Sequence, residues 1–323
     1  MPCPLLSNVT QAIGHTPMVQ LQRIGAAQPG AILLKLEASQ PGGSVKDRVG
    51  LHLVEAAEAQ GLIHPQRSVL IEPTSGNSGI ALAMVAAVKG YKLIIVMPEN
   101  CSMERRVVLA AYGAQVVLTP AAAGMEGACT KATELAKTIA NAYMLDQFNN
   151  HANVAVHEAT TGPEIWEATG GQLDAFVACV GTGGTLSGVA RFLKRQNPAI
   201  AIVAVEPMES AILSGCAAGS HGIQGVGTGF VPGILAKELI NQVIAVSTEE
   251  AMAMAVRLAK EEGLLSGISS GANVVACLQL LAQPAFAGKR VATLQCSTGE
   301  RYLTSPLFAP LWQQAQQWPV TPV

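Results

Sequence analysis

The chain has 323 residues, of which half are hydrophobic and 13% are charged, so it can bury a large core. The formal net charge is −2 and no run of lysine or arginine occurs, which argues against nucleic acid or an anionic membrane as a partner. Aromatic residues make up 4% of the chain, too few for a surface that stacks on bases.

The mean hydropathy of +0.34 raises the question of a membrane span. The longest apolar run, residues 80–88, ends at Lys89 and is far shorter than the roughly 20 residues that a spanning helix needs. Residues 1–10 lack the basic region and apolar block of a signal peptide. The seven cysteines, Cys3 among them, are scattered without a CxxC pair, as in a reducing compartment. We therefore expect a cytoplasmic protein with no membrane span.

Short apolar strands alternate with Ala-rich helical segments along the chain. The predicted strands are residues 32–37, 69–72, 93–96, 115–118, 175–179, 201–205, 243–246 and 290–294. Helices are predicted at residues 78–89, 125–139, 185–195 and 249–262, where apolar residues recur every three or four positions. Continuous apolar strands between helices indicate parallel sheets covered on both faces. Since at least eight strands exceed one comfortable sheet, we expect an α/β fold of two lobes, with a boundary near residues 149–152.

In open parallel sheets, ligands bind on the turns that lead from a strand into a helix. The first such turn, Pro41-Gly-Gly-Ser-Val-Lys-Asp-Arg48, contains Lys46 between glycines and a helical run that starts at Asp47. A positive potential from the helix N-terminus and from Arg48 would lower the pKa of the Lys46 amine, and a neutral amine is what Schiff-base chemistry requires. The alternative is a surface lysine beside a capping serine, Ser44.

The second turn, Pro73-Thr-Ser-Gly-Asn-Ser-Gly79, combines hydroxyls, an amide and free backbone N–H groups in front of a predicted helix. Such a turn can cradle a carboxylate. The alternative is a plain helix cap made by Thr74 or Ser75.

The third turn, Gly181-Thr-Gly-Gly-Thr185, follows a predicted strand and favours phosphate binding through backbone N–H groups. A dinucleotide-binding turn requires G-x-G-x-x-G, but Leu186 occupies the third glycine position. Glu206, at the end of the next strand, could hold a ribose, so an NAD-dependent oxidoreductase stays open as an alternative.

The fourth turn, Gly267-Ile-Ser-Ser-Gly271, matches the G-x-S-x-G nucleophile elbow of hydrolases. That chemistry needs an acid and a histidine later in the chain, yet the last histidine is His221 and the last aspartate Asp174. The hydrolase interpretation therefore fails. The six histidines lack zinc-ligand spacing, so most are expected on the surface or in loops and no metal site is predicted.

Taken together, these turns resemble the cysteine synthase (O-acetylserine sulfhydrylase) family of fold-type II pyridoxal-phosphate enzymes, in which the fold is like that of the tryptophan synthase β subunit. The resemblance extends over almost the whole chain. Further matching blocks are Ile13-Gly-His-Thr-Pro17, Met97-Pro-Glu-Asn100, Glu104-Arg-Arg106, Thr161-Gly-Pro-Glu-Ile-Trp166, Gln224-Gly-Val-Gly-Thr-Gly-Phe230 and Gly299-Glu-Arg-Tyr-Leu303.

The resemblance implies a role for each matched residue. Lys46 would carry pyridoxal 5′-phosphate and later remove the substrate α-proton. The cofactor phosphate would be held by Gly181, Thr182, Gly183, Gly184 and Thr185. Asn77 would bind the 3′-oxygen of the ring, and Ser269 would face the ring nitrogen. The substrate carboxylate would be bound by Thr74, Ser75, Gly76, Ser78 and Gln147.

The resemblance also implies the reaction: O-acetyl-L-serine and sulfide would give L-cysteine and acetate through an α-aminoacrylate intermediate. Use of O-phosphoserine, thiosulfate or homocysteine stays open, as does a regulatory relative without turnover. Expected features are a smaller mobile lobe of residues 39–150, a larger cofactor-binding lobe of residues 1–38 plus 151–323, a homodimer and docking of a serine acetyltransferase C-terminal tail. Ser78 and Thr228 replace the more usual Thr and Ala, and Thr228 could change acceptor access.

Overall fold

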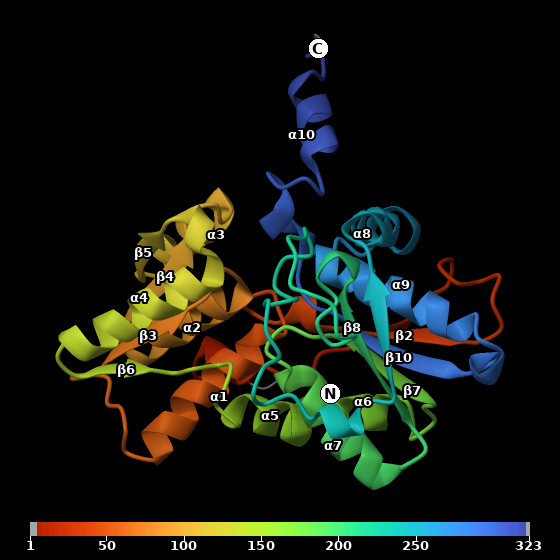
Figure 1. Ribbon diagram of the computed structural model, residues 1–323, viewed down its shortest axis with the longest axis horizontal. Helices are drawn as coiled ribbons and strands as arrows, with labels where there is room; N and C mark the ends of the chain where they lie inside the picture. The colour runs from red at the N-terminus through yellow and green to blue at the C-terminus, as the bar shows by residue number, and fades with distance from the viewer. Residues whose placement is uncertain (1–4, 321–323) are drawn as a thin grey trace.

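The computed structural model describes residues 5–320 and consists of two lobes, each built on its own sheet (Figure 1). The larger lobe holds six strands in the order β1-β2-β10-β7-β8-β9. β1 pairs antiparallel with β2, and the remaining neighbours pair in parallel. The strands are β1 (Met18–Gln20), β2 (Ala31–Leu36), β7 (Ala175–Cys179), β8 (Ala201–Pro207), β9 (Gln242–Val246) and β10 (Arg290–Gln295).

The smaller lobe holds four parallel strands in the order β5-β4-β3-β6. They are β3 (Val69–Pro73), β4 (Lys92–Pro98), β5 (Gln115–Thr119) and β6 (Ala142–Met144). α4 (Gly124–Thr138) covers one face of this sheet. The other face packs against α1 (Lys46–Ala59) and α2 (Asn77–Lys89), with α3 (Met103–Ala111) beside α2. Buried apolar side chains fill both interfaces.

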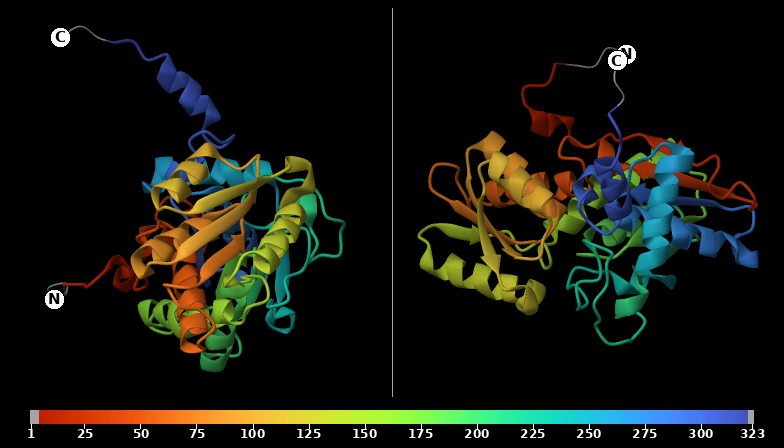
Figure 2. Two further views of the ribbon diagram at one scale, coloured as in Figure 1. Left: turned by 90° about the vertical axis from the view of Figure 1, so that its left-hand side faces the viewer. Right: turned by 90° about the horizontal axis from the view of Figure 1, so that it is seen from above.

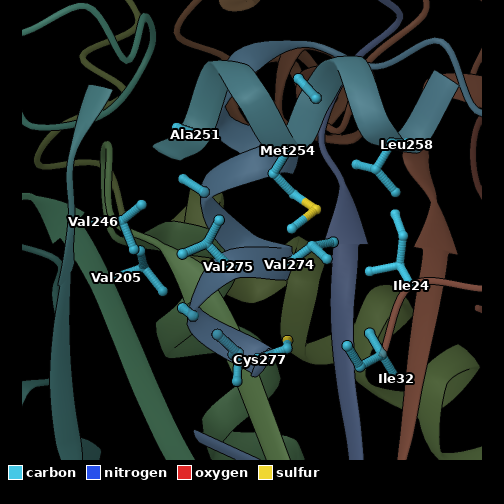
Figure 3. Close-up of a cluster of buried hydrophobic side chains, with 14 of the residues drawn as sticks. Ile24, Ile32, Val205, Val246, Ala251, Met254, Leu258, Val274, Val275 and Cys277 are labelled. Carbon is cyan, nitrogen blue, oxygen red and sulfur yellow. The ribbon is translucent and has the colours of Figure 1, made fainter. Parts of the chain in front are cut away.

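Helices also cover both faces of the larger sheet. α9 (Ile268–Leu281) lies directly on one face, with α8 (Thr248–Glu262) packed over it, and their buried side chains meet those of the strands (Figure 3). The opposite face carries α6 (Gly162–Ala168) and α7 (Gly184–Gln196), and α5 (Ala152–Val156) packs between α7 and α1 of the smaller lobe. A π-helical turn, His157–Thr161, joins α5 to α6. The last helix, α10 (Ala309–Gln316), points away from both lobes (Figure 2).

The α/β fold class and all eight predicted strands are confirmed, with bounds that differ by at most two residues. β1 and β6 were not predicted, because a three-residue strand carries too little alternation to be read from sequence. The lobe division at residues 39–150 stays a prediction. Among the described residues, no helix combines the length and apolarity needed to cross a membrane. All cysteines of residues 5–320 are free thiols, and Cys3 lies outside the described residues.

Candidate active site

The carboxyl ends of strands from both sheets border a cavity of about 570 Å³. Every predicted site residue lines this cavity except Gly184, which lies directly behind the wall as the first residue of α7. The amine-bearing turn and the glycine turn, more than 130 residues apart in sequence, therefore face the same space. Both lobes contribute, because a parallel sheet presents the ends of its strands along one edge.

Lys46 is the first residue of α1 and faces the cavity from a firmly held turn. The N–H of Val45 donates to the carbonyl of Cys296 at 3.0 Å, and Ser44 Oγ accepts the Lys46 N–H at 3.3 Å. Burial lowers the pKa of the Lys46 amine, while the nearby Cys296 and Glu37 act in the opposite direction. The amine is thus biased toward its neutral, nucleophilic form.

The predicted effect of Arg48 on this amine is wrong. The Arg48 guanidinium is buried in ion pairs with Glu37, at 2.8 Å, and Glu164, at 2.7 Å. These two carboxylates compensate its charge, and burial is the main cause of the lowered pKa at Lys46. Arg48 instead ties α1 to α6 and to the end of β2, which fixes the helix that carries the lysine.

The α2 turn does not act as a side-chain cap, contrary to the capping alternative. Gly76 is the N-cap of α2 and no side chain caps the helix start. Thr74 Oγ1 accepts the Gly76 N–H at 3.2 Å, which tightens the turn before the helix begins. Backbone N–H groups in the first turn of this 13-residue helix are therefore available at the cavity, where they can bind a carboxylate.

Two polar contacts shape the substrate side of the cavity. The Ser78 hydroxyl donates to Gln147 Oε1 at 2.6 Å, which leaves the amide N–H groups of Gln147 as donors. The two carboxyl oxygens of Glu72 accept the backbone N–H groups of Asp146, at 2.9 Å, and Gln147, at 3.1 Å. These contacts hold a turn in which Asp146 has a φ of 53°, so the position of Gln147 is set by a buried acid that sequence reasoning missed.

The α7 turn has the crowded geometry of an anion cradle. A Cβ at Gly181 would lie 2.5 Å from the carbonyl oxygen of Gly225, and Gly183 has a φ of +84°. A Cβ at Gly184 would lie 2.0 Å from Asn153 Oδ1. Glycines are thus required for the chain to bring its N–H groups to the cavity, since no side chain caps α7 either.

Two residues behind this cradle were not predicted. Asn153 Nδ2 donates to the carbonyl of Gln147 and to Thr182 Oγ1, both at 2.9 Å. His157 lies between Thr161 Oγ1, at 2.9 Å, and Thr185 Oγ1, at 3.1 Å. His157 is fully buried in the π-helical turn, so the expectation of a surface histidine is wrong here, and burial keeps its pKa well below the usual value. An isolated histidine or asparagine carries no sequence pattern that reveals such a role.

Ser269 enters the cavity from the first turn of α9, whose N-cap is Gly267. The backbone carbonyl of Ser269 accepts the thiol of Cys179 at 3.6 Å, and Cys296 also lines the wall beside it. Burial raises the pKa of both thiols, so neither is poised as a nucleophile. A neutral hydroxyl beside neutral thiols makes this wall suitable for the uncharged edge of an aromatic ring.

The acidic residue of the NAD alternative is occupied elsewhere. The Glu206 carboxylate accepts the N–H of Leu213 at 2.6 Å and the N–H and hydroxyl of Ser214 at 3.0 and 2.6 Å. With these bonds made and the side chain buried, Glu206 cannot reach a ribose. The opposite wall is the segment 219–229, where Thr228 lines the cavity and donates to the carbonyl of Phe230 at 3.0 Å.

The residues present fit pyridoxal phosphate. Its aldehyde requires a neutral amine, which Lys46 offers, and its phosphate requires a cradle from which side chains are excluded, as at residues 181–185. Asn77 has its carbonyl oxygen engaged by Arg301 at 2.8 Å, so its amide N–H group is the donor left for a ring oxygen. Within residues 5–320, no group of three or more metal-ligating side chains gathers.

Comparison with known proteins agrees with this chemistry. Residues 9–297 match the family described as pyridoxal-phosphate dependent enzyme. A cysteine synthase of Staphylococcus aureus is 50% identical over 305 residues, covering 94% of this chain and 97% of that protein.

Two solved structures are equally similar in fold. The cysteine synthase of Entamoeba histolytica has a TM-score of 0.90 and 40% identity, over 96% of this chain and 93% of that one. The O-acetylserine dependent cystathionine β-synthase of Helicobacter pylori also has a TM-score of 0.90 and 40% identity, over 95% of this chain and 100% of that one. The predicted resemblance is thereby confirmed: the chain belongs to the cysteine synthase family of pyridoxal-phosphate dependent enzymes.

Proposed function

We propose that the protein converts O-acetyl-L-serine and sulfide to L-cysteine and acetate. The observation that carries this proposal is that the Lys46 amine, biased to its neutral form by burial, shares one cavity with the uncapped starts of α2 and α7. The start of α2 suits the carboxylate of an amino acid, and the start of α7 suits a phosphate. When bound, the cofactor supplies the electron sink for negative charge at the substrate Cα.

The substrate carboxylate binds at the start of α2. Backbone N–H groups from Asn77 onward and the hydroxyls of Thr74 and Ser75 surround it, and the amide N–H of Gln147 closes the cradle. Ser78 acts by orienting Gln147, because its own proton is donated to Gln147 Oε1. This arrangement fixes the Cα–H bond relative to Lys46, which supplies the proximity that proton transfer needs.

Lys46 moves the proton. Its Nζ removes the proton from Cα, the Cβ–O bond breaks and acetate leaves, hydrosulfide forms the Cβ–S bond, and Lys46 returns a proton to Cα. Residues 181–185 would hold the cofactor phosphate, Asn77 would bind its ring oxygen and Ser269 would meet its ring nitrogen, since all of these residues except Gly184 line the cavity. A hydroxyl cannot keep a proton on that nitrogen as a carboxylate would, so charge on Cα is less delocalised and loss of the β-substituent is favoured over transamination.

The purified protein is expected to absorb visible light. Addition of O-acetylserine should change that absorbance, and sulfide should restore it while cysteine accumulates. Lys46→Ala should lose the covalent cofactor and at least about 10³-fold in turnover, whereas the surface variant Lys131→Ala should behave as the parent does. A Lys46→Ala protein that stays yellow and active after dialysis would overturn the assignment.

Ser269→Asp tests the ring-nitrogen role separately. We expect it to raise the fraction of turnovers that end in transamination, measured as the 2-oxo acid that keeps its acetyl group (acetoxypyruvate) per O-acetylserine consumed, against the acetate and cysteine of β-replacement. An unchanged product ratio in a variant that still binds the cofactor would exclude this role for Ser269.

The sulfur acceptor and the serine donor are a second question. A structural neighbour at equal similarity is an O-acetylserine dependent cystathionine β-synthase, which favours homocysteine as the acceptor to test against sulfide. Supplying sulfide, thiosulfate or homocysteine with O-acetylserine or O-phosphoserine, and identifying each product by mass, ranks the alternatives. The NAD alternative loses its acidic residue at Glu206, and retention of Lys46 and the phosphate cradle speaks against a non-catalytic relative.

We also propose a homodimer, which the exposed apolar side chains of Leu311, Trp312 and Trp318 support. The molar mass in solution by light scattering tests it.

A serine acetyltransferase C-terminal tail would enter through the same carboxylate cradle, so a tail peptide with a free carboxylate should compete with O-acetylserine and its amidated form should not. A cytoplasmic location, supported by the free thiols, is testable by cell fractionation.

A further inference from the structure

Arg301 lies outside the cavity wall, in the 3₁₀ turn η8 (Gly299–Tyr302) that follows β10. Its Nη1 donates to Asn77 Oδ1 at 2.8 Å, and its Nη2 donates to the carbonyl of Gly42. A single guanidinium thus contacts the first residue of α2 and the turn that leads to Lys46. The guanidinium therefore joins the turns at the N-termini of α1 and α2, at the end of these packed helices that faces the cavity.

The contact decides which way the Asn77 amide faces. An asparagine side chain presents an oxygen at one corner and an N–H donor group at the other, and it can turn over. A guanidinium can only donate, so the atom that meets Arg301 must be the carbonyl oxygen. The N–H group is then the corner left for the cavity that Asn77 lines.

The site around Arg301 is built to hold it. Gly43 has a φ of +74°, and a Cβ there would lie 2.8 Å from Arg301 Nη2, so the glycine keeps the place of the guanidinium open. The Thr298 N–H donates to the Gly43 carbonyl at 3.1 Å, which binds the glycine turn to the segment that carries Arg301. Asp47, held by the Gly42 N–H, is a charge partner close by.

We propose that Arg301 is a positioning residue that holds the Asn77 amide with its N–H toward the cofactor ring oxygen and, through Gly42, keeps the Lys46 turn at the matching distance. The inference rests on the proposed roles of Asn77 and Lys46 and adds the residue that coordinates them. It predicts a defect in how the cofactor is held, and not only a loss of stability.

Arg301→Lys is the principal test, because an ammonium keeps the charge but offers one nitrogen in place of the two that contact Asn77 and Gly42. We expect the apoprotein to bind pyridoxal phosphate about tenfold more weakly, the effect of losing one charge-assisted hydrogen bond. The visible spectrum should also shift toward shorter wavelengths, since loss of a donor favours the neutral ring oxygen. The control Arg257→Lys, an exposed pair with Glu261 on α8, should change neither.

A double-mutant cycle separates positioning from simple stabilisation. If Arg301 acts through Asn77, Arg301→Lys should add little to the loss of cofactor affinity already caused by Asn77→Ala. Strictly additive losses, or a single variant with the parental affinity and spectrum, would overturn the inference. Failure of the parent protein itself to bind the cofactor would instead count against the proposed function.

Asn77→Asp keeps the test valid should Arg301→Lys fail to fold. The aspartate retains an oxygen for Arg301 but replaces the N–H donor with a second oxygen. We expect the thermal unfolding of the apoprotein to stay at or above that of the parent, while cofactor affinity and spectrum change as in Arg301→Lys. A parental spectrum in this variant would contradict the proposal.

Discussion

The starts of α2 and α7 use the same device on opposite sides of one cavity, yet they differ in the space around them. Each helix begins at a glycine N-cap without a capping side chain, so each turns free backbone N–H groups toward the cavity. Around α7 the chain is packed so closely that a Cβ at Gly184 would collide with Asn153. Around α2 a Cβ at Gly76 would meet no heavy atom within 4 Å.

The polar contacts around the two helix starts also differ: those behind α7 are buried, and the one at α2 lies at the cavity surface. Behind α7, buried Asn153 and His157 bond to the hydroxyls of Thr182 and Thr185, which fixes the cradle before any ligand arrives. At α2, Ser78 bonds to Gln147 at the cavity surface. A preorganised, crowded cradle suits a group that stays bound, and an open one suits a substrate that enters and leaves in every turnover.

Replacing one glycine in each turn should give the largest difference between the crowded start of α7 and the open start of α2. Gly184→Ala forces a methyl group to within 2.0 Å of Asn153 Oδ1, so the cradle must shift and cofactor affinity should fall by about 100-fold or more. Gly76→Ala has room and a φ of −132°, which alanine adopts without strain. Cofactor affinity should therefore stay parental in Gly76→Ala, and only the KM for O-acetylserine should change.

Titration of the two apoproteins with pyridoxal phosphate measures the difference directly. Equal losses of affinity in both variants would show that the two turns are not divided between cofactor and substrate. A substrate effect in Gly184→Ala without any cofactor effect would reverse the assignment.

A smaller effect is expected from Ser78→Ala. Removal of the hydroxyl leaves the buried Gln147 Oε1 without its donor, at a cost of about 1–3 kcal/mol, and frees the amide to turn over. The KM for O-acetylserine should rise about tenfold, with cofactor affinity unchanged. Ser78→Thr keeps the hydroxyl and should retain the parental KM. A drop in turnover at constant KM would instead place Ser78 in the chemical step.

The sequence predicted the strands and the four turns because both carry local patterns. Continuous apolar runs mark β3 and β4, and glycine with hydroxyl residues marks the turns at Thr74 and Gly181. Assignment of pyridoxal phosphate came from the family resemblance, since the turns alone left NAD open. The structure removed that alternative by the bonds that occupy Glu206.

Other parts of the site had no local signal. Asn153, His157 and Arg301 act across the fold, through partners 29, 28 and 224 residues away in the sequence. The prediction that Arg48 lowers the pKa of Lys46 was wrong because the ion-pair partners of Arg48 are also distant in the sequence. The sequence places Arg48 two positions from Lys46, but only the fold reveals that Glu37 and Glu164 bind its charge.

Glu72 gives a further test that concerns the substrate side alone, because it holds the turn of Gln147 and does not line the cavity. Burial raises the pKa of this carboxyl to about 8 from an ordinary value of 4.5, against the opposing effect of the N–H groups of Asp146 and Gln147. The folded state then binds more protons than the unfolded state between those two pH values, so its contribution to stability falls as pH rises toward 8. One such group changes the free energy of unfolding by at most about 1.4 kcal/mol per pH unit.

Glu72→Gln removes this titration and mimics the protonated acid. The stability of the parent should therefore decline relative to the variant between pH 5 and pH 8 and level off above pH 8, as measured by urea unfolding of the apoproteins at several pH values. The comparison with the variant is necessary because burial also raises the pKa of Asp47, to about 7, which gives the parent a second slope of the same sign. That slope is present in both proteins and cancels in the difference. If the free energies of unfolding of parent and variant change with pH in parallel, Glu72 is ionised over the whole range. The two backbone donors would then stabilise its charge, and the turn of Gln147 would not depend on pH.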